Sequence, residues 1–438
     1  MRRDRTYAGF GFGAIQAGLF LYEAFQSGAF RRLVVGEVVP EVVSSVRRSE
    51  GHFSVNVAER DHVQRIDVGP VEIDNPAAES DRQRLVDAVA EAEEIGTAVP
   101  SVQHYVSQHP GSLHRILAQG LRKKAAVGGP RAVVYTAENH NHAAEILEEK
   151  VLQEVPAAER KAVSAQVRFL NTVIGKMSGV VSDPQEILEE KLVTITPGGQ
   201  RAFLVEAFNR IYISKIHFDE GNGNAAFTRG IRVFEEKEDL LPFEEAKLYG
   251  HNATHALAAY LGFVRGVKWI ADLCEVPGVL PFLRAAFLEE SGKALIRKHQ
   301  GIDPLFTEQG YREYAEDLLT RMTNPHLRDQ VERVGRDPER KLAWDDRLIG
   351  TMRMAIRQGV QAHRYAVGAA AALASMNPPI PESTAPLEEW LDPLWKAASP
   401  ERTEKRAVLA LIEEGCRCLR RWQNSGFADL ERLFREDD

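Results

Sequence analysis

Cysteine is scarce in this chain of 438 residues, which contains only Cys274, Cys416 and Cys418. The Cys-Arg-Cys pair lacks the spacing of a redox or zinc motif, and no second pair accompanies it. So few cysteines predict a reducing, cytoplasmic setting without a structural metal. His140 and His142 are spaced as metal ligands on a strand would be, but no third ligand is evident, so we interpret them as surface or helix-start residues.

An excess of basic charge is also missing. Lys and Arg total 55 against 63 Asp and Glu, a net charge of −8, and the mean hydropathy is −0.29. This balance excludes a general basic footprint for nucleic acid or for an anionic membrane. The uncharged stretch Thr6–Tyr22 resembles a signal sequence, but five of its 17 residues are Gly or Gln. The stretch is also too short to span a membrane, so we expect no membrane association.

The length allows two domains, and the pattern of apolar residues changes between the two halves. Strand-like segments end near Ile216–Asn224, and almost everything after Pro242 has the pattern of helices. The sequence therefore predicts an α/β Rossmann-type dinucleotide-binding domain at residues 1–218, followed by an all-α catalytic and substrate domain at residues 219–438. The segments expected to be strands of the first domain are Tyr7–Phe10, Leu33–Val35, the hairpin Phe53–Val57 with Val63–Val68, Ile95–Val99, Ala132–Thr136, Val167–Leu170, Leu192–Thr196 and Phe203–Val205.

A glycine-rich turn follows the first expected strand and precedes a helix. Gly11 permits a tight turn, and Gly13 has no side chain to block a pyrophosphate, which the amides of Ala14 and Ile15 can approach at the start of the helix. Glu37 ends the second strand, where a carboxylate binds a ribose diol and repels the extra phosphate of NADP. The motif favours NAD, although a turn of this kind also suits S-adenosylmethionine.

Further cofactor-binding candidates follow other expected strands. Open α/β sheets bind ligands at the carboxyl ends of their strands. Thr97, Ala98 and Val99 lie at the end of one strand, and Glu138 with Asn139 follows the next. Asn171 ends the strand after that.

Lys247–Gly262 is predicted to be a helix with polar residues among its alanines. At about 100° per residue, Lys247 and His255 are about 80° apart, and Asn252 lies about 60° beyond His255. One broad face therefore carries a possible base, an amide and an imidazole. The alternative is structural: the lysine reaches water, and the histidine is an ordinary hydrogen-bonded group.

The series Lys-x-x-x-x-Asn-x-x-His followed by Ala-Tyr-Leu-Gly resembles the catalytic signature of the polyol-specific long-chain dehydrogenases, the mannitol dehydrogenase family. Arg321–Arg336, Asp337–Lys341, Asp346–Ile349 and Glu289–Gly292 resemble the branch that uses mannitol 1-phosphate. The resemblance extends from about Tyr7 to Met376. Gln16 departs from it, since that branch has glycine there, and so does Gly175-Lys-Met177 after Asn171.

The resemblance implies an NAD-dependent oxidoreductase that needs no metal. Hydride transfer would interconvert a sugar alcohol, in the first place a hexitol phosphate such as mannitol 1-phosphate, and its ketose. Lys247 would act as the general base, Asn252 and Asn171 would donate hydrogen bonds to the reacting oxygen, and His255 would orient the substrate. The family also implies a monomer or a small homo-oligomer.

A basic cluster and three rival functions stay open. Arg333, Arg336, Arg340 and Lys341 are predicted to bind the substrate, or else they are solvated charges on a helix. The chain could instead act on an unphosphorylated polyol or uronate. Outside this class, it could be an S-adenosylmethionine-dependent methyltransferase or a non-catalytic NAD-binding protein.

Overall fold

The computed structural model describes residues 5–208, 210–218, 227–376, 379–380 and 384–436. The chain divides into two compact units, Met1–Leu241 and Pro242–Asp438. The division falls later than the predicted boundary between residues 218 and 219, because β12 (Phe234–Lys237) pairs with the sheet of the first unit. The run Asp219–Asn224, where the strand pattern ends, lies outside the described residues.

An eight-stranded sheet in the order β12-β11-β8-β7-β6-β1-β2-β5 organises the first unit. Neighbouring strands pair in parallel except at β8 and β11, which are antiparallel to each other. The strands of this unit are β1 (Arg5–Phe10), β2 (Phe30–Gly36), β3 (Phe53–Ala58), β4 (Val63–Val68), β5 (Glu72–Asp74), β6 (Glu94–Thr97), β7 (Ala132–Thr136), β8 (Val167–Ile174), β9 (Ser178–Val181), β10 (Ala202–Glu206), β11 (Ile211–Ser214) and β12.

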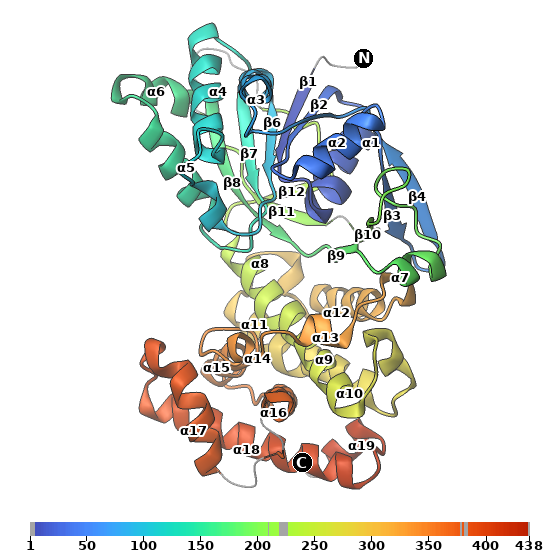
Figure 1. Ribbon diagram of the computed structural model, residues 1–438. Coiled ribbons are helices and arrows are strands. Elements are labelled where there is room, and N and C mark those ends of the chain that lie inside the picture. The colour runs from blue at the N-terminus through green and yellow to red at the C-terminus, as the bar shows by residue number, and fades with distance from the viewer. Residues whose placement is uncertain (1–4, 209, 219–226, 377–378, 381–383, 437–438) are drawn as a thin grey trace. The chain divides into compact units, whose positions relative to one another are not determined.

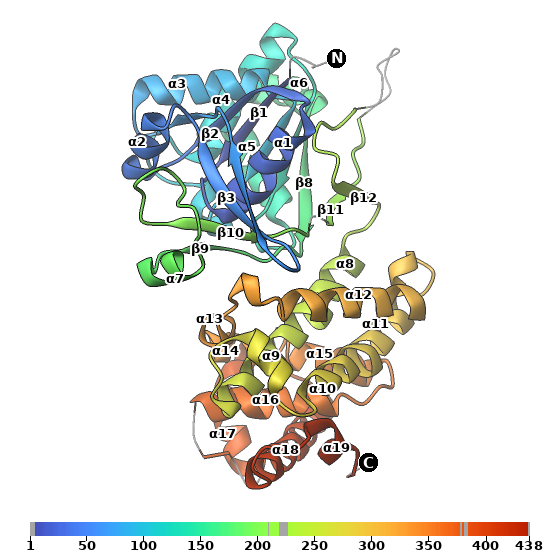
Figure 2. The same ribbon diagram turned by 90° about the vertical axis from the view of Figure 1, so that its right-hand side faces the viewer.

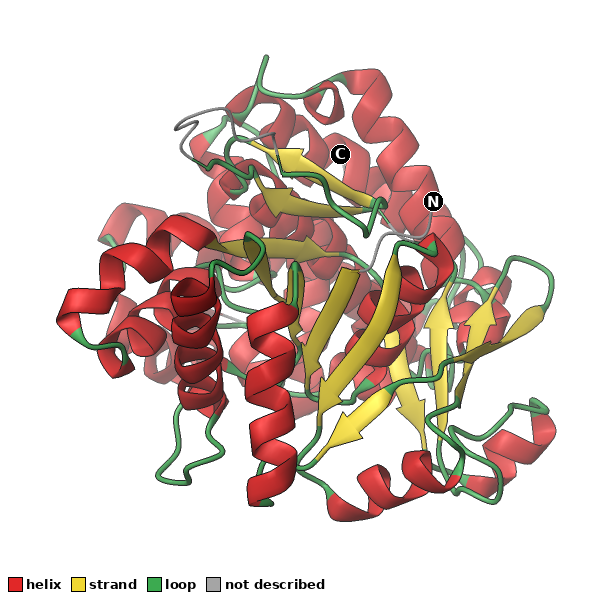
Figure 3. Cartoon of the chain, turned by 90° about the horizontal axis from the view of Figure 1, so that it is seen from above, coloured by secondary structure: helices red, strands yellow, loops and turns green. Residues whose placement is uncertain are grey.

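Helices cover both faces of this sheet (Figures 1 and 3). One core joins it to α3, α4, α5 and α6, and the other joins it to η1, α1 and α2. Strands buried on both faces need continuous apolar runs, as in Leu33–Val35 and Ala132–Thr136. The helices of the unit are η1 (Gln16–Leu21), α1 (Tyr22–Ser27), α2 (Pro40–Arg48), α3 (Glu79–Glu91), η2 (Val102–Tyr105), α4 (Leu113–Val127), α5 (Ala143–Glu154), α6 (Ala157–Gln166) and α7 (Pro184–Glu189).

A second sheet, in the order β4-β3-β10-β9, lies in the same unit (Figure 2). The hairpin of β3 and β4 confirms the prediction. Phe203–Val205 forms part of β10 and belongs to this sheet rather than to the main one. The strand predicted at Leu192–Thr196 is wrong: β3 already pairs on both edges, and the Asn56 side chain bonds the Val193 backbone in place of a ladder.

The regular secondary structure of the second unit is helical in the described residues, apart from an isolated β-bridge between Trp269 and Gln330. The alanine-rich α16 is buried from Arg364 to Leu373, as expected of a helix that is apolar all round, and it packs between α9 and α18 (Figure 2). The helices are α8 (Leu241–Glu245), η3 (Ala246–Asn252), α9 (Ala253–Arg265), η4 (Ile270–Glu275), α10 (Val279–Ala285), η5 (Ala286–Gly292), α11 (Lys293–Lys298), η6 (Pro304–Phe306), α12 (Glu308–Met322), η7 (Pro325–Leu327), α13 (Val331–Gly335), α14 (Pro338–Lys341), α15 (Ile349–Arg357), α16 (His363–Met376), α17 (Thr384–Trp395), η8 (Lys396–Ala398), α18 (Arg402–Asn424) and α19 (Leu430–Arg435).

The predicted fold class, a Rossmann-type α/β region followed by an all-α region, is confirmed. In the part of the chain that the structure describes, no helix has the length and apolar character required to cross a bilayer.

Candidate functional site

The glycine turn lies at the carboxyl end of β1, where a nucleotide is expected. Gly11 has a φ of +82°, and a Cβ there would lie 2.6 Å from the carbonyl oxygen of Ala98. A Cβ on Gly13 would meet nothing within 4 Å, so the space beside it is open. Ala14 and Ile15 begin the helical turn and are partly exposed. The turn therefore offers an open backbone surface that fits a pyrophosphate.

Gln16, which departs from the expected glycine, is accommodated by its neighbours. Its side chain is fully buried, and its Nε2 donates to the Tyr7 hydroxyl at 2.8 Å. A Cβ on Gly9 would lie 2.1 Å from Gln16 Nε2, so the glycine in the strand makes room for the larger residue in the helix. Gly18 provides a second close approach, because a Cβ there would meet Val205 Cγ1 at 2.5 Å.

The Glu37 carboxylate binds the backbone of the glycine turn. Its Oε2 accepts a hydrogen bond from the Phe12 amide at 2.7 Å, and its Oε1 accepts one from the Val39 amide at 2.8 Å. The residue is only 7% exposed. A carboxylate has about four acceptor positions, so these two bonds leave capacity for a ribose hydroxyl.

Glu138 joins the ends of β6 and β7. Its carboxylate accepts hydrogen bonds from Thr97 Oγ1 and the Val99 amide, both at 2.9 Å, and from the Tyr105 hydroxyl. Burial raises the pKa of Glu138 despite these donors. Thr97 is fully buried, whereas Asn139 is exposed. Glu138 and Thr97 are therefore buried beneath the strand ends where the cofactor is expected. Of these three residues, Asn139 is the one exposed to a ligand.

Asn171 lies within β8 rather than at its end, because pairing with β11 extends the strand to Ile174. Its Oδ1 accepts from the Ala144 amide at 2.9 Å, and its Nδ2 donates to Glu145 Oε2 at 2.8 Å. The amide nitrogen carries two hydrogens, so one donor remains for a substrate oxygen.

The unexpected segment Gly175-Lys-Met177 is tied to the end of β10. Lys176 is 7% exposed, and its Nζ donates to the Phe208 carbonyl at 3.2 Å. The Met177 amide donates to Glu206 Oε1. Two hydrogen bonds therefore hold in place the segment that departs from the family pattern.

The predicted helix Lys247–Gly262 begins with a π-helical segment, η3, before continuing as α9. In an α-helix, Lys247 and Asn252 would point about 140° apart at about 100° per residue. A π-helix bonds residue i to residue i+5, which turns residues five apart toward the same side. The estimate of the polar face from α-helical geometry is therefore wrong for this pair, and the base and the amide lie closer in direction than predicted.

Lys247 is partly exposed, yet its ammonium group is destabilised. Burial, followed by the positive charge of Arg347, lowers its pKa to about 8, and Glu244 opposes this only in part. Within the described residues, the structure records no hydrogen bond or ion pair for Lys247 or for the half-buried side chain of Asn252. Both groups therefore stay available to a ligand.

Two histidines of this helix differ in their surroundings. His255 Nε2 lies 2.8 Å from Asp329 Oδ2. His251 is 4% exposed, and its ring centroid lies 6.2 Å from that of His255. Burial, and then the charge of Arg321, lowers the pKa of His251 well below its ordinary value, so this imidazole is neutral.

The arginines of the predicted basic cluster have different partners. Arg333 forms an ion pair with Asp329, and Arg340 lies 3.4 Å from Asp346. Arg336 is exposed, and the structure records no acidic partner for it among the described residues. Arg336 is therefore the guanidinium of this group best placed to bind an added anion.

Lys341 is buried, and its Nζ donates to the Arg336 carbonyl. Burial, Arg347 and Arg340 lower its pKa to about 8. Arg347 thus acts on both Lys341 and Lys247, which places these three cations near one another in the helical unit. Asp346 offsets part of this charge, since its Oδ1 lies 2.7 Å from Arg347 Nε, and the positive charge that remains favours a bound anion.

Sequence reasoning missed Arg347, Asp329 and His251. Arg347 lies within the Asp346–Ile349 segment that resembles the family, and Asp329 lies within the Arg321–Arg336 block, so the motifs contained them without indicating a role. His251 lacks a neighbouring signal, because its burial becomes evident only in the packed helix. The candidate residues fall into two sets: the nucleotide-type set and Asn171 lie in the α/β unit, and the others lie in the helical unit.

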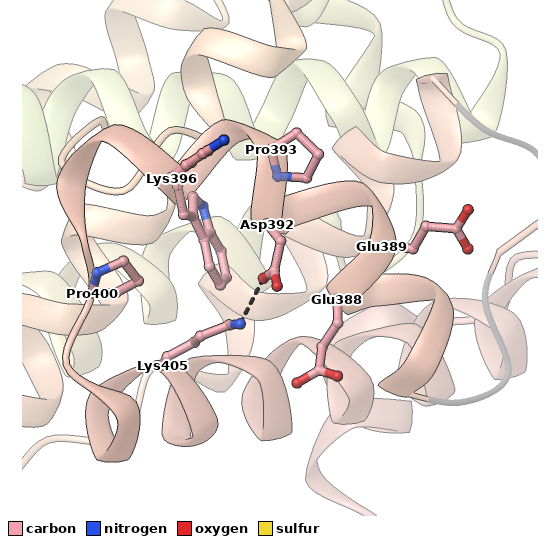
Figure 4. A pocket seen from close by; sticks show the side chains of 8 residues that line it. Glu388, Glu389, Asp392, Pro393, Lys396, Pro400 and Lys405 are labelled. Atoms are coloured by element: carbon pink, nitrogen blue, oxygen red, sulfur yellow. Dashed lines mark ion pairs between the residues drawn. The ribbon is translucent and has the colours of Figure 1, made fainter.

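A separate pocket lies between α17 and α18, where Lys405 Nζ and Asp392 Oδ1 are 2.7 Å apart (Figure 4). None of the predicted site residues lines it. Its lining residues are Glu388, Glu389, Asp392, Pro393, Trp395, Lys396, Pro400 and Lys405.

His140 and His142 lie where the sequence predicted, at the start of a helix. His142 precedes α5, and its amide donates to His140 Nδ1. The described residues contain no group of three or more His, Cys, Asp or Glu suited to a metal ion.

Both units match known family models. The mannitol dehydrogenase Rossmann domain matches residues 8–224, and the mannitol dehydrogenase C-terminal domain matches residues 239–414. A mannitol-1-phosphate 5-dehydrogenase of Bacillus licheniformis is 29% identical over 343 residues, 78% of this chain and 80% of that protein. One of Arthrobacter sp. is 29% identical over 418 residues, 92% of this chain and 97% of that protein.

Solved structures share the fold at lower identity. The mannitol 2-dehydrogenase of Pseudomonas fluorescens, in a ternary complex with NAD and D-mannitol, superposes with a TM-score of 0.67 at 18% identity, covering 99% of this chain and 95% of that one. A D-sorbitol dehydrogenase in substrate-free form gives a TM-score of 0.73 at 13% identity, covering 98% and 95%.

The lowered pKa of Lys247 predicts that its amine reacts at lower pH than that of an ordinary lysine, whose pKa is about 10.4. Competitive acetylation followed by mass spectrometry should show half-maximal reactivity of Lys247 near pH 8. Arg347→Gln removes a positive charge and should move this midpoint to higher pH. The exposed Lys293 serves as the internal standard. Identical pH dependence of Lys247 and Lys293 would contradict the assignment.

Proposed function

This chain belongs to the mannitol dehydrogenase family, and we propose that it is an NAD-dependent dehydrogenase that interconverts a hexitol phosphate, such as mannitol 1-phosphate, and its ketose phosphate. The observation that carries the proposal is the environment of Lys247. A lysine with a pKa of about 8 and no acidic partner in the described residues is suited to accept a proton near neutral pH. The family match supplies the reaction class.

Bound NAD would supply the hydride acceptor. The open backbone beside Gly13 and the close approach at Gly11 fit its pyrophosphate, and the carboxylate of Glu37 fits its ribose. The acidic residue disfavours a 2′-phosphate, which supports NAD over NADP. Thr97, Glu138 and their hydrogen bonds keep the neighbouring strand ends in place.

Oxidation requires the substrate hydroxyl to lose a proton as its carbon loses a hydride. Neutral Lys247 accepts that proton at Nζ, and about a tenth of the lysine is neutral at pH 7 if its pKa is about 8. Asn252 and Asn171 donate amide hydrogens to the oxygen as it becomes a carbonyl. Amides suit both directions of the reaction because they do not titrate. His255 orients the same oxygen.

The preference for a phosphorylated substrate rests on the cationic residues and on the relatives. Arg347, Lys341 and the exposed Arg336 bring positive charge to the helical unit, although Asp346 pairs with Arg347 and the chain as a whole is acidic. Both curated relatives described above carry the name mannitol-1-phosphate 5-dehydrogenase. The alternative is a free polyol, as in the mannitol 2-dehydrogenase that shares the fold.

Lys247→Ala tests the base. We expect kcat for polyol oxidation to fall by about 10²–10⁴-fold, the usual contribution of a general base, with NADH affinity nearly unchanged. Stopped-flow kinetics and NADH fluorescence titration measure the two quantities. Lys293→Ala, at an exposed lysine of α11, is the matched control. An equal loss of catalysis and NADH binding would contradict the assignment.

Glu37→Ser tests whether Glu37 selects NAD over NADP at the ribose. The ratio of kcat/KM with NAD to that with NADP should fall by about 10-fold or more, because the variant no longer repels the 2′-phosphate. Absolute rates should also fall, since the amides of Phe12 and Val39 lose their acceptor. Glu41→Ser, at an exposed site in α2, is the control. An unchanged ratio would show that Glu37 does not select the cofactor.

Arg336→Ala tests the phosphate contact. A charged hydrogen bond contributes about 1.5–3 kcal/mol, so KM for the hexitol phosphate should rise by about 10–100-fold. KM for the corresponding free hexitol should change little. Arg312→Ala, at an exposed arginine of α12, controls for general loss of charge. Equal effects on both substrates would exclude Arg336 as a phosphate ligand.

A further inference from the structure

Asp329 has a fixed place between η7 and α13. Its carbonyl accepts a hydrogen bond from the Ile270 amide at 2.9 Å. The following residues, Gln330 and Val331, bridge to Trp269 and Lys268. The residue is 4% exposed. Backbone bonds on both sides thus define where its carboxylate can lie.

The carboxylate of Asp329 lies between two residues of the candidate site. Its Oδ2 is 2.8 Å from His255 Nε2, and its Oδ1 accepts a hydrogen bond from Arg333 Nη2. Neither Asp329 Oδ2 nor His255 Nε2 has a hydrogen-bond partner elsewhere among the described residues, so each is the nearest candidate partner of the other. The two atoms lie within hydrogen-bond distance, although the pair is not aligned as a full hydrogen bond.

The charge of Asp329 is maintained by its neighbours. Burial alone would raise the pKa of this carboxyl group, but His255 and Arg333 together hold it below its ordinary value. The group is therefore ionised at neutral pH. An ionised carboxylate only accepts hydrogen bonds, so the nitrogen of His255 that faces it must carry a hydrogen.

We propose that Asp329 is a positioning residue that keeps hydrogen on Nε2 of His255 and leaves the lone pair of Nδ1 free to accept the substrate hydroxyl. The proposal rests on the function proposed above. It also assigns Arg333 a supporting role, since Nη2 of its guanidinium is bound by Asp329. A histidine whose second nitrogen is bound by a carboxylate is fixed in both tautomer and orientation.

The alternative is an ion pair that only stabilises the fold. A double-mutant cycle separates the two roles. Asp329→Asn keeps the size of the side chain and removes its charge, and kcat should fall by about 10–100-fold, the range seen when an orienting partner is lost. The double variant Asp329→Asn/His255→Ala should then be slower than His255→Ala by less than about 2-fold. The control is Asp392→Asn, whose partner Lys405 is outside the candidate site.

Two results would overturn the proposal. In one, Asp329→Asn keeps the kcat and KM of the unaltered chain. In the other, the effects of Asp329→Asn and His255→Ala multiply, as expected of independent sites. If Lys247→Ala abolishes activity in the same assay, the function proposed above survives this failure.

A measurement on the unaltered chain covers the case in which Asp329→Asn does not fold. Labelling with ¹⁵N-histidine and comparison with His255→Ala identify the His255 signals. At a pH where the ring is neutral, we expect hydrogen on Nε2. Hydrogen on Nδ1 would overturn the proposal. This result requires no turnover, so it stays distinct from the outcome in which no polyol is oxidised and the proposed function fails.

Discussion

The partial desolvation of one ammonium group constrains the chemistry of the helical unit. Lys247 loses hydration and also faces the positive charge of Arg347, so its protonated form is disfavoured. Within the described residues, no carboxylate forms an ion pair with it. The packed helices therefore hold Lys247 where its charged form is less stable than it would be in water. A lysine with a pKa of about 8 is neutral in about a tenth of the molecules at pH 7, and the proposed hydride chemistry depends on that fraction.

Buried carboxylates perform the complementary task in both units. Glu37 bonds two backbone amides beneath the glycine turn, and Glu138 joins the ends of two strands. Asp329 lies between an imidazole and a guanidinium in the helical unit. In each case a carboxyl group that is almost inaccessible to water fixes the place of a group expected to face a ligand. Preorganisation of this kind avoids rearrangement during the reaction.

The sequence predicted the fold class and most element positions because apolar periodicity and glycine turns are local signals. It failed at Leu192–Thr196, where an asparagine side chain occupies the backbone groups that a strand would pair. The π-helical start of the Lys247 helix could not be predicted either, since no local sequence pattern distinguishes it from an α-helix. Gln16 is explained only by Gly9 on the neighbouring strand, a contact between segments. Arg347 and Asp329 emerged for the same reason: their significance lies in neighbours distant along the chain.

The central claim is that this chain transfers hydride between a hexitol phosphate and NAD. The most direct test is the initial rate of NADH formation by the purified full chain with a matched panel of hexitol phosphates, free hexitols, pentitols and uronate-derived alcohols. We predict that a hexitol phosphate gives the highest kcat/KM and that NADP in place of NAD lowers it. A free polyol as the best substrate would contradict the phosphate assignment. No NADH formation with any member of the panel would contradict the claim itself.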